Sequence, residues 1–412
     1  MTAAPSASPM PDNALAALRG LKVVECATVV AAPLCGKLMA DFGAEVVHVE
    51  HPRTGDHLRQ FGFSKDGVNP WWKTYARNKR LVTLDIGKPA GRDVLLKMVA
   101  DADVLIENFR PGRMEQWGLG WDVLSAINPR LIMVRVTGYG QTGPYASQPG
   151  FGTLMEAMSG FAEITGEPDG PPTLPQYPLA DTCAAFYAAL ATMFAVYSRD
   201  VAGTGKGQIV DVSIWESLFA TLGPNALVHA LTGVPPKRTG NRTISSAPRN
   251  TYLTKDGLWV ALAGSTQSTA VRLFTVIGRP DMLEDPRFAT NMERLKNHPA
   301  MDEIIAPWIA GRTRDEVIRI LRENEVPVGP VYNIADIEAD PHAVAREMVI
   351  EAPDGEGRPP LTMEGIFPKL SGTPGAVWAA GREKGVDNEA IYKGELGLSD
   401  AEFAALQADG II

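Results

Sequence analysis

An aspartate that precedes a long apolar segment is the side chain in this sequence best suited to covalent chemistry. Asp181 stands two residues before a run of small apolar residues at 183–198, which is typical of a buried helix. A carboxylate at the start of a helix is stabilised by the helix dipole and by free backbone N–H groups, so we expect Asp181 to be ionised and nucleophilic at neutral pH. Capping the N-terminus of the helix is also the commonest role of an aspartate before such a helix, and the spacing alone favours that structural role.

Several other kinds of catalytic site lack their motifs. The sequence contains no G-x-x-x-x-G-K-[ST] phosphate loop, and the first strand-to-helix turn, at 27–36, contains no G-x-G-x-x-G dinucleotide motif. It has no G-x-S-x-G elbow of the kind that carries a nucleophilic serine. Its six histidines show no H-x-x-x-H or H-E-x-x-H spacing and its three cysteines no C-x-x-C pair. We therefore expect no metal site and no permanently bound cofactor.

Length and composition indicate an enzyme-sized globular protein. A chain of 412 residues with 45% apolar and 21% charged residues is long enough for two domains. The formal net charge of −9 argues against a nucleic-acid partner, which needs a surplus of Lys and Arg. The first residues lack the basic and apolar regions of a signal peptide, and the apolar run at 183–198 is too short to span a bilayer. We expect a cytoplasmic protein without a membrane partner.

Strand-like and helical patterns alternate along the first half of the chain, which is typical of a doubly wound parallel sheet. Strands are expected at 21–27, 44–50, 81–86, 103–109, 131–137 and 208–214. Helices are expected at 34–42, 91–101, 121–127 and 183–198. These elements predict an α/β fold with a Rossmann-like large domain.

The pattern changes near Gly223. The segment 225–325 contains a hairpin-like pair around Lys255-Asp256-Gly257 and several helices, one of which opens with a capping box from Thr313 to Glu316. This segment predicts a smaller α+β domain. The expected division is a flexible tail at 1–17, the large domain at 18–224, the small domain at 225–325 and a final segment at 326–412.

A series of short motifs occurs in a fixed order along the chain. They are ARNKRLVTLD (76–85), ENFRPG (107–112), VTGYGQTGPY (136–145), PGFGTLMEAMSGF (149–161), LADTCAAFYAAL (179–190), SAPRNTYLTKDG (246–257), DPRFATNMERL (285–295) and VPVGPVYN (326–333). Over residues 18–412 the sequence resembles the family III CoA transferases, which include formyl-CoA transferase and the carnitine CoA transferases. The resemblance implies that 326–412 returns to the large domain, and that two subunits form an interlocked homodimer.

The resemblance places Asp181 at the family's catalytic aspartate. It implies transfer of CoA from an acyl-CoA donor to a carboxylic acid acceptor, so that CoA and acyl-CoA are substrates. In this chemistry the aspartate attacks the donor thioester to give a mixed anhydride, and the CoA thiolate converts the anhydride to an aspartyl-CoA thioester. The acceptor then repeats these steps in reverse. The breadth of the family suggests succinyl-CoA and a small dicarboxylate as the substrates.

The resemblance also implies contacts with CoA and with the acyl group. The implied CoA contacts are Val30, Ala31, His51, Leu84, Asn108, Phe109, Arg110 and Arg113, and the implied substrate contacts are Phe151, Gly152 and Gly264. Arg110 or Arg113 is suited to a CoA phosphate because a guanidinium forms bidentate hydrogen bonds. Spacing alone is equally consistent with solvated arginines in a turn.

A few positions depart from the family pattern. His51 and Gln116 stand where relatives have Arg, and Gly87 stands where they have Lys, which here follows as Lys88. The grip on the CoA phosphates must therefore differ in detail. Residues 263–266 read Ala-Gly-Ser-Thr in place of the tetraglycine of formyl-CoA transferase, so oxalate is not expected as the acid.

Two other functions remain open at this point. An α-methylacyl-CoA racemase has the same fold but needs an acid and a base, and the His-Asp pair of those relatives is replaced here by Phe151-Gly152. A non-catalytic CoA-binding protein is the second alternative, against which the intact Asp181 argues. Glu156 shares a predicted helix face with Gly152 and could reach the active site, although a glutamate in mid-helix is more often solvated.

Overall fold

The computed structural model describes residues 15–412, which divide into two compact units. Among the described residues, the large unit consists of 15–161, Leu174–Gly223 and Ala345–Ile412, and the small unit of Ala162–Thr173 and Pro224–Val344. Of the tail predicted at 1–17, residues 1–14 lie outside the described residues. The small unit differs from the predicted segment 225–325 because it includes Ala162–Thr173 and ends at Val344.

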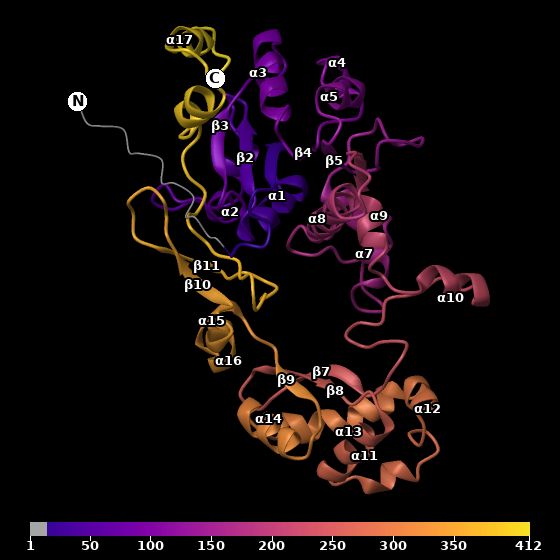
Figure 1. Ribbon diagram of the computed structural model, residues 1–412. Helices are drawn as coiled ribbons and strands as arrows, with labels where there is room; N and C mark the ends of the chain where they lie inside the picture. Colours follow the sequence, from indigo (N-terminus) through magenta and orange to yellow (C-terminus); the bar gives the residue numbers. More distant parts are fainter. Residues whose placement is uncertain (1–14) are drawn as a thin grey trace. The chain divides into compact units, whose positions relative to one another are not determined.

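Six parallel strands form the centre of the large unit (Figure 1). They are β1 (Lys22–Cys26), β2 (Glu45–Glu50), β3 (Arg80–Thr83), β4 (Val104–Glu107), β5 (Ile132–Thr137) and β6 (Ile209–Ser213). Their order is β3-β2-β1-β4-β5-β6, and Val24 of β1 pairs with Val47 of β2 on one side and with Leu105 of β4 on the other. This is the strand order of a Rossmann-like sheet, so the predicted fold class is confirmed.

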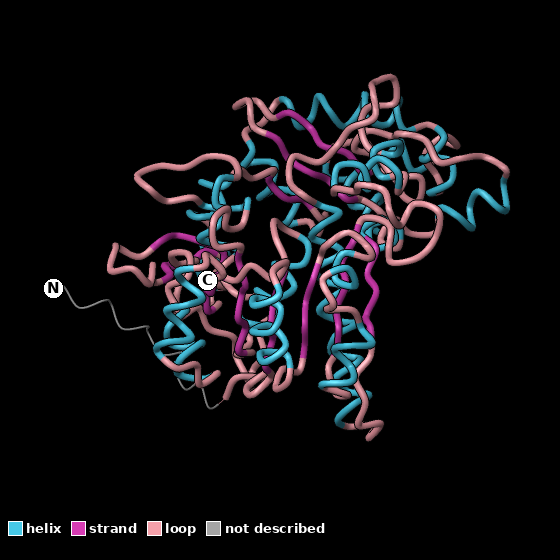
Figure 2. The backbone as a smooth tube through the Cα atoms, turned by 90° about the horizontal axis from the view of Figure 1, so that it is seen from above, coloured by secondary structure: helices cyan, strands magenta, loops and turns pink. Residues whose placement is uncertain are grey.

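Successive residues of these strands contribute to two separate cores. Val23, Val104 and Ile132 belong to the core that includes helices α1 (Ala31–Asp41) and α8 (Leu179–Asp200). Their neighbours Val24, Leu105 and Met133 belong to the core that includes α3 (Pro89–Val99), α5 (Trp121–Ile127) and the C-terminal residues. Side chains alternate between the two faces of a sheet, so these two cores cover both faces of the parallel sheet. Its strands are drawn in magenta in Figure 2.

The remaining elements of the large unit lie in its loops and its C-terminal segment. They are η1 (His57–Gln60), α2 (Pro70–Tyr75), α4 (Arg113–Gln116), α6 (Gly152–Met158), α9 (Ile214–Phe219), β10 (Val349–Ala352), β11 (Leu361–Glu364), η3 (Ala390–Glu395) and α17 (Asp400–Ala408). The C-terminal segment covers the outer edge of β3. There Asp387 accepts a hydrogen bond from Leu81 N at 2.7 Å and Asn388 one from Thr83 N at 2.8 Å. Such a cover protects the open edge of a sheet.

Helix α8 is longer than expected, since its 22 residues include Leu179 to Thr182 in addition to the predicted 183–198. Its alanines at 180, 184, 188 and 195 are buried in the core shared with α1. The opposite side exposes Phe186, Leu190, Phe194 and Tyr197. By length and composition alone α8 could cross a membrane, which corrects the expectation that this segment is too short.

The small unit contains an antiparallel sheet in the order β7-β8-β9, formed by β7 (Arg249–Leu253), β8 (Trp259–Ala263) and β9 (Val328–Pro330). Its helices are α10 (Asn225–Thr232), α11 (Gln267–Val276), η2 (Pro280–Leu283), α12 (Asn291–Lys296), α13 (His298–Ala310), α14 (Arg314–Glu323), α15 (Ile334–Ala339) and α16 (Pro341–Ala345), while α7 (Phe161–Ile164) begins at the boundary. The predicted hairpin is confirmed, because Leu253 pairs with Trp259 across the turn. The predicted capping box is confirmed at Thr313 and Glu316.

Candidate active site

A cavity of about 450 Å³ opens at the carboxyl ends of the parallel strands. Its walls include the loops that follow β1 and β4, the end of β5 and the first turns of α6 and α8. Strands β1 and β4 are the neighbours at which the strand order reverses, and a crevice at this point is where open α/β sheets bind ligands. The fold therefore places the cavity where a ligand is expected.

Asp181 lines this cavity from the first turn of α8. Helix α8 begins at Leu179 and its N-cap is Pro178, which forms no side-chain capping bond. The N-cap interpretation of Asp181 is therefore wrong. A Cβ atom built on Gly152 would lie 2.0 Å from Asp181 Oδ2, so only a glycine at position 152 leaves room for the carboxylate in this place.

The environment of Asp181 makes its carboxylate more basic than usual. The pKa of Asp181 is raised from 3.8 to about 6, mainly by burial and in second place by repulsion from Glu156. The start of the helix was expected to keep the carboxylate ionised, but the loss of hydration outweighs that stabilisation. Asp181 nevertheless remains mostly ionised at pH 7, and a carboxylate stripped of water is a stronger nucleophile.

Glu156 is a second carboxylate in the same cavity. Its side chain is 3% exposed, and its Oε1 accepts a hydrogen bond from Ala180 N at 3.4 Å, at the start of α8. Burial raises the pKa of Glu156. The expectation of a solvated glutamate is therefore wrong. The shared helix face with Gly152 was the sequence signal for this placement.

Most of the predicted contact residues beyond β1 and β4 line the cavity. Val30 and Ala31 lie after β1, and Asn108, Phe109 and Arg110 lie after β4. Asn108 also joins the two loops, because its Oδ1 accepts a hydrogen bond from Thr28 N at 3.0 Å and its Nδ2 donates one to Thr28 O at 2.8 Å. The predicted substrate residues Phe151 and Gly152 line the same cavity.

Four predicted contact residues are not part of the cavity wall: His51, Leu84, Arg113 and Gly264. Leu84 is buried in the core, and Gly264 belongs to the small unit. The side chain of Arg113 donates a hydrogen bond to Gln116 Oε1 at 3.1 Å. Their assignment to the binding of CoA or substrate stays a prediction.

His51 is held by its own loop. Its Nδ1 accepts hydrogen bonds from the backbone N–H groups of Arg53 at 3.2 Å and Thr54 at 3.3 Å. Its Nε2 lies 3.7 Å from a carboxylate oxygen of Asp85. Both ring nitrogens therefore have partners within the protein.

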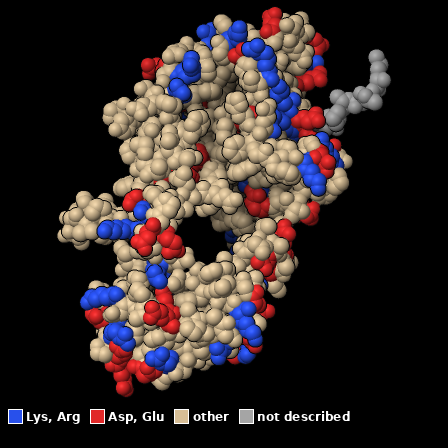
Figure 3. Space-filling model, turned by 180° about the vertical axis from the view of Figure 1, so that it is seen from behind, with Lys and Arg blue, Asp and Glu red and all other residues tan. Residues whose placement is uncertain are grey.

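Charged side chains of both signs lie interspersed on the face of the molecule drawn in Figure 3. Among the described residues that line the cavity, Arg110 is the one Lys or Arg. An anionic ligand in the cavity therefore depends on Arg110 and on backbone N–H groups for its positive counterpart. Helix α1 offers such N–H groups, because its N-cap Val30 makes no side-chain capping bond.

Comparison with known proteins identifies the family. The model of CoA-transferase family III matches residues 18–388. The chain belongs to this family. It is 40% identical to succinyl-CoA–D-citramalate CoA-transferase of Chloroflexus aurantiacus over 96% of this chain and 98% of that protein. It is 38% identical to the beta subunit of succinyl-CoA–L-malate CoA-transferase of the same organism, again over 96% of this chain and 98% of that one.

Solved structures agree with this assignment. A CaiB/BaiF family protein from Brucella suis superposes on this family III transferase with a TM-score of 0.81 and 33% identity, over 92% of this chain and 99% of that one. The recognition of the family and of its enzymatic activity from the sequence motifs is thereby confirmed. The protein is a CoA-transferase whose substrates are CoA thioesters and carboxylic acids.

Proposed function

We propose that this transferase moves CoA from succinyl-CoA to a short dicarboxylic acid, with Asp181 as the nucleophile. The names of the two Chloroflexus relatives support this pairing of donor and acceptor. The observation that carries the assignment of Asp181 is its place in the cavity, where the missing side chain of Gly152 gives its carboxylate room. The close approach of Gly152 to Asp181 also argues against a racemase, because an aspartate at position 152 would occupy the space of the Asp181 carboxylate.

The first half of the reaction transfers CoA to the enzyme. The Asp181 carboxylate attacks the thioester carbonyl of succinyl-CoA, the C–S bond breaks, and a mixed anhydride and the CoA thiolate form. The thiolate then attacks the aspartyl carbonyl of the anhydride. The C–O bond breaks, succinate leaves with the electron pair, and an aspartyl-CoA thioester remains.

The second half reverses these steps with the acceptor acid. The acceptor carboxylate attacks the aspartyl thioester, and the CoA thiolate leaves as a new anhydride forms. Attack of the thiolate on the acceptor carbonyl then releases the new acyl-CoA and regenerates the Asp181 carboxylate. No proton is gained or lost overall, so these steps need no acid or base besides the Asp181 carboxylate.

Arg110 supplies the positive charge for this chemistry. Both succinyl-CoA and a dicarboxylic acceptor keep a free carboxylate, and CoA itself carries phosphates. A guanidinium at the cavity wall can pair with one of these anionic groups through bidentate hydrogen bonds. The backbone N–H groups at the N-terminus of α1, which no side chain caps, can bind a second anionic group.

The homodimer implied by the sequence is also part of the proposal. Phe186, Leu190, Phe194 and Tyr197 form an exposed apolar side of α8, and such surfaces commonly mark subunit contacts. Sedimentation of the purified protein tests this state. A monomer at micromolar concentration would contradict it.

A transfer assay tests the proposed function. The protein is incubated with succinyl-CoA and a panel of mono- and dicarboxylic acids, and new CoA thioesters are identified by mass. Asp181→Ala is expected to lose roughly a thousandfold or more of the rate, because it removes the nucleophile. Thr182→Ala is the matched control, since it changes the next residue of the same helix. Transfer by Asp181→Ala at the parent rate would refute the proposal.

A further inference from the structure

The loop between β1 and α1 contains a strained residue. Val29 has a φ angle of 69°, in the left-handed region. For a β-branched residue this conformation is unfavourable, and it persists only where the surroundings hold it. Thr28, Val29 and Val30 all line the cavity. Whatever holds Val29 therefore also shapes one wall of the proposed binding site.

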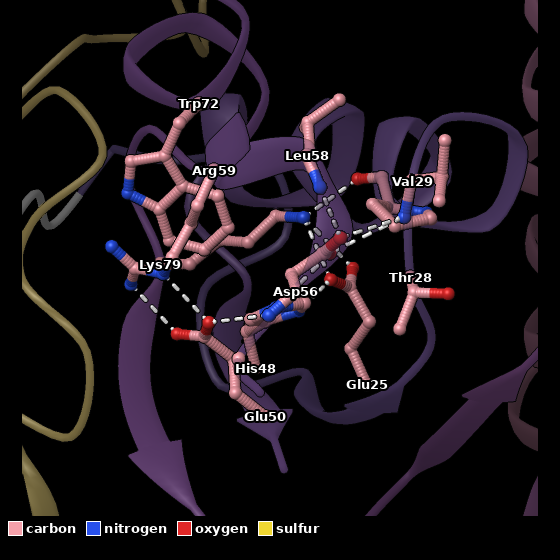
Figure 4. A network of polar contacts seen from close by, with 12 residues as sticks. Glu25, Thr28, Val29, His48, Glu50, Asp56, Leu58, Arg59, Trp72 and Lys79 are labelled. Carbon is pink, nitrogen blue, oxygen red and sulfur yellow. Dashed lines mark hydrogen bonds and ion pairs between the residues drawn. The ribbon is translucent and has the colours of Figure 1, made fainter. Parts of the chain in front are cut away.

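Asp56 holds Val29 from a position 27 residues further along the chain (Figure 4). Its Oδ1 accepts hydrogen bonds from Val29 N at 3.0 Å and from Leu58 N at 2.8 Å. Its Oδ2 accepts a second, longer bond from Val29 N at 3.3 Å. The side chain is 1% exposed, so water does not compete for these charge-assisted bonds. Asp56 itself is not among the residues that line the cavity.

Buried polar side chains lie beside the Asp56 carboxylate. His48 lies between two carboxylates, with its Nε2 3.6 Å from Asp56 Oδ2 and its Nδ1 2.5 Å from Glu25 Oε1. Lys79 Nζ donates hydrogen bonds to both oxygens of Glu25, at 2.8 and 3.0 Å. These side chains are at most 2% exposed. The hydrogen bonds among Lys79, Glu25 and His48 hold the imidazole ring beside the Asp56 carboxylate.

The backbone of Asp56 is fixed by a second group of residues. Asp56 N donates a hydrogen bond to Glu50 Oε2 at 2.9 Å. The Arg59 guanidinium binds both oxygens of Glu50 at 2.7 Å and lies 3.7 Å from the ring centroid of Trp72. Both the backbone and the side chain of Asp56 are therefore anchored to buried groups.

We infer that Asp56 is a positioning residue, which holds the Thr28–Val30 loop in the conformation that binds acyl-CoA. His48, held by Glu25, packs beside its carboxylate. The inference rests on the proposed function of the cavity and extends it to residues that touch neither substrate. It predicts that loss of Asp56 weakens binding of the CoA thioester more than it slows the chemical steps.

Three variants separate positioning from simple stability. Asp56→Ala removes both acceptors, so only a fraction of molecules keeps the left-handed turn. The KM for succinyl-CoA is then expected to rise about tenfold while kcat changes by less than about threefold. Asp56→Asn keeps one oxygen for the two N–H groups, and its KM is expected to lie within about threefold of the parent value. Calorimetric titration with CoA is expected to show the same order of affinities, with the weakest binding by Asp56→Ala.

Asn128→Ala is the matched control. Asn128 is also buried and also braces the backbone, because its Nδ2 donates hydrogen bonds to Val99 O and Ala102 O and its Oδ1 accepts one from Arg130 N, but it lies at the opposite ends of the strands. Its loss is expected to lower the melting temperature without changing the KM for succinyl-CoA. An equal rise in KM for Asn128→Ala would overturn the inference.

Two further outcomes keep the inference falsifiable. A parent-like KM and CoA affinity in folded Asp56→Ala would refute the positioning role. If Asp56→Ala does not fold, Asp56→Ser replaces it in the test, because its shorter side chain cannot reach both N–H groups; the KM is again expected to rise about tenfold, and no rise would equally refute the role. Absence of CoA transfer by the parent protein would instead refute the proposed function, so the two failures are distinguishable.

Discussion

Replacement of Glu156 by glutamine changes the charge beside the nucleophile and little else. The variant removes the negative charge that faces Asp181, but keeps the size of the side chain and an oxygen that can accept the hydrogen bond from Ala180 N. If the two carboxylates repel each other across the cavity, this substitution must make Asp181 easier to ionise. The pH dependence of the reaction reports that change directly.

The size of the effect follows from the causes of the raised pKa of Asp181. Burial is the larger cause of the rise from 3.8 to about 6, and repulsion by Glu156 is the second. With burial unchanged, we expect the pKa to fall by about 1 in the variant, a difference of ~1.4 kcal/mol. At pH 5 the ionised fraction of Asp181 then rises from about a tenth to about a half.

The assay is kcat/KM for succinyl-CoA between pH 4.5 and 8. Only the ionised carboxylate attacks, so the rate falls as the pH drops through the apparent pKa of the pair, and this midpoint is expected to move from about 6 to about 5 in Glu156→Gln. Asp122→Asn is the control and should keep the parent midpoint, because Asp122 is an exposed acid on α5, whose Leu124 belongs to the other core. An unchanged or higher midpoint in Glu156→Gln would refute the proposed repulsion.

Three further substitutions have defined outcomes. Asp181→Asn should raise the free energy of unfolding at pH 7 by up to about 3 kcal/mol, because folding raises the pKa of Asp181 and an ionised Asp181 therefore destabilises the folded state. This gain should disappear as the pH falls below 3.8, and denaturant titration at several pH values measures it. Gly152→Ala places a Cβ where Asp181 Oδ2 lies, so kcat should fall about a hundredfold with little change in melting temperature, and parent-like turnover would contradict the geometry. Arg110→Gln should raise the KM for at least one anionic substrate about tenfold, whereas unchanged KM values for both substrates would exclude a role in binding.

The sheet could be predicted from the sequence because its strands are short apolar runs separated by helical patterns. Strand β4 and strand β5 are buried along their whole length, and both were expected from those runs. The start of α8 was not, because Asp181 and Thr182 are residue types preferred at a helix N-cap, although Leu179 and Ala180 are good helix formers. That error of four residues made Asp181 look like a cap.

Residues that act through long-range contacts were beyond the reach of the sequence. Asp56 belongs to no motif, and its bond to Val29 joins residues 27 positions apart. The helix face that Glu156 shares with Gly152 indicated its place near the site, but its burial beside Asp181 could not be predicted from that position. The raised pKa of Asp181 likewise depends on lost hydration, which spacing does not describe.

A covalent adduct on Asp181 is the most direct test of the mechanism. The protein is mixed with succinyl-CoA, quenched with acid, digested and analysed by mass spectrometry. We expect the peptide containing Asp181 to carry CoA through a thioester in the parent protein, and the corresponding peptide of Asp181→Ala to carry none. Efficient transfer without any adduct, or an adduct that persists in Asp181→Ala, would contradict this mechanism.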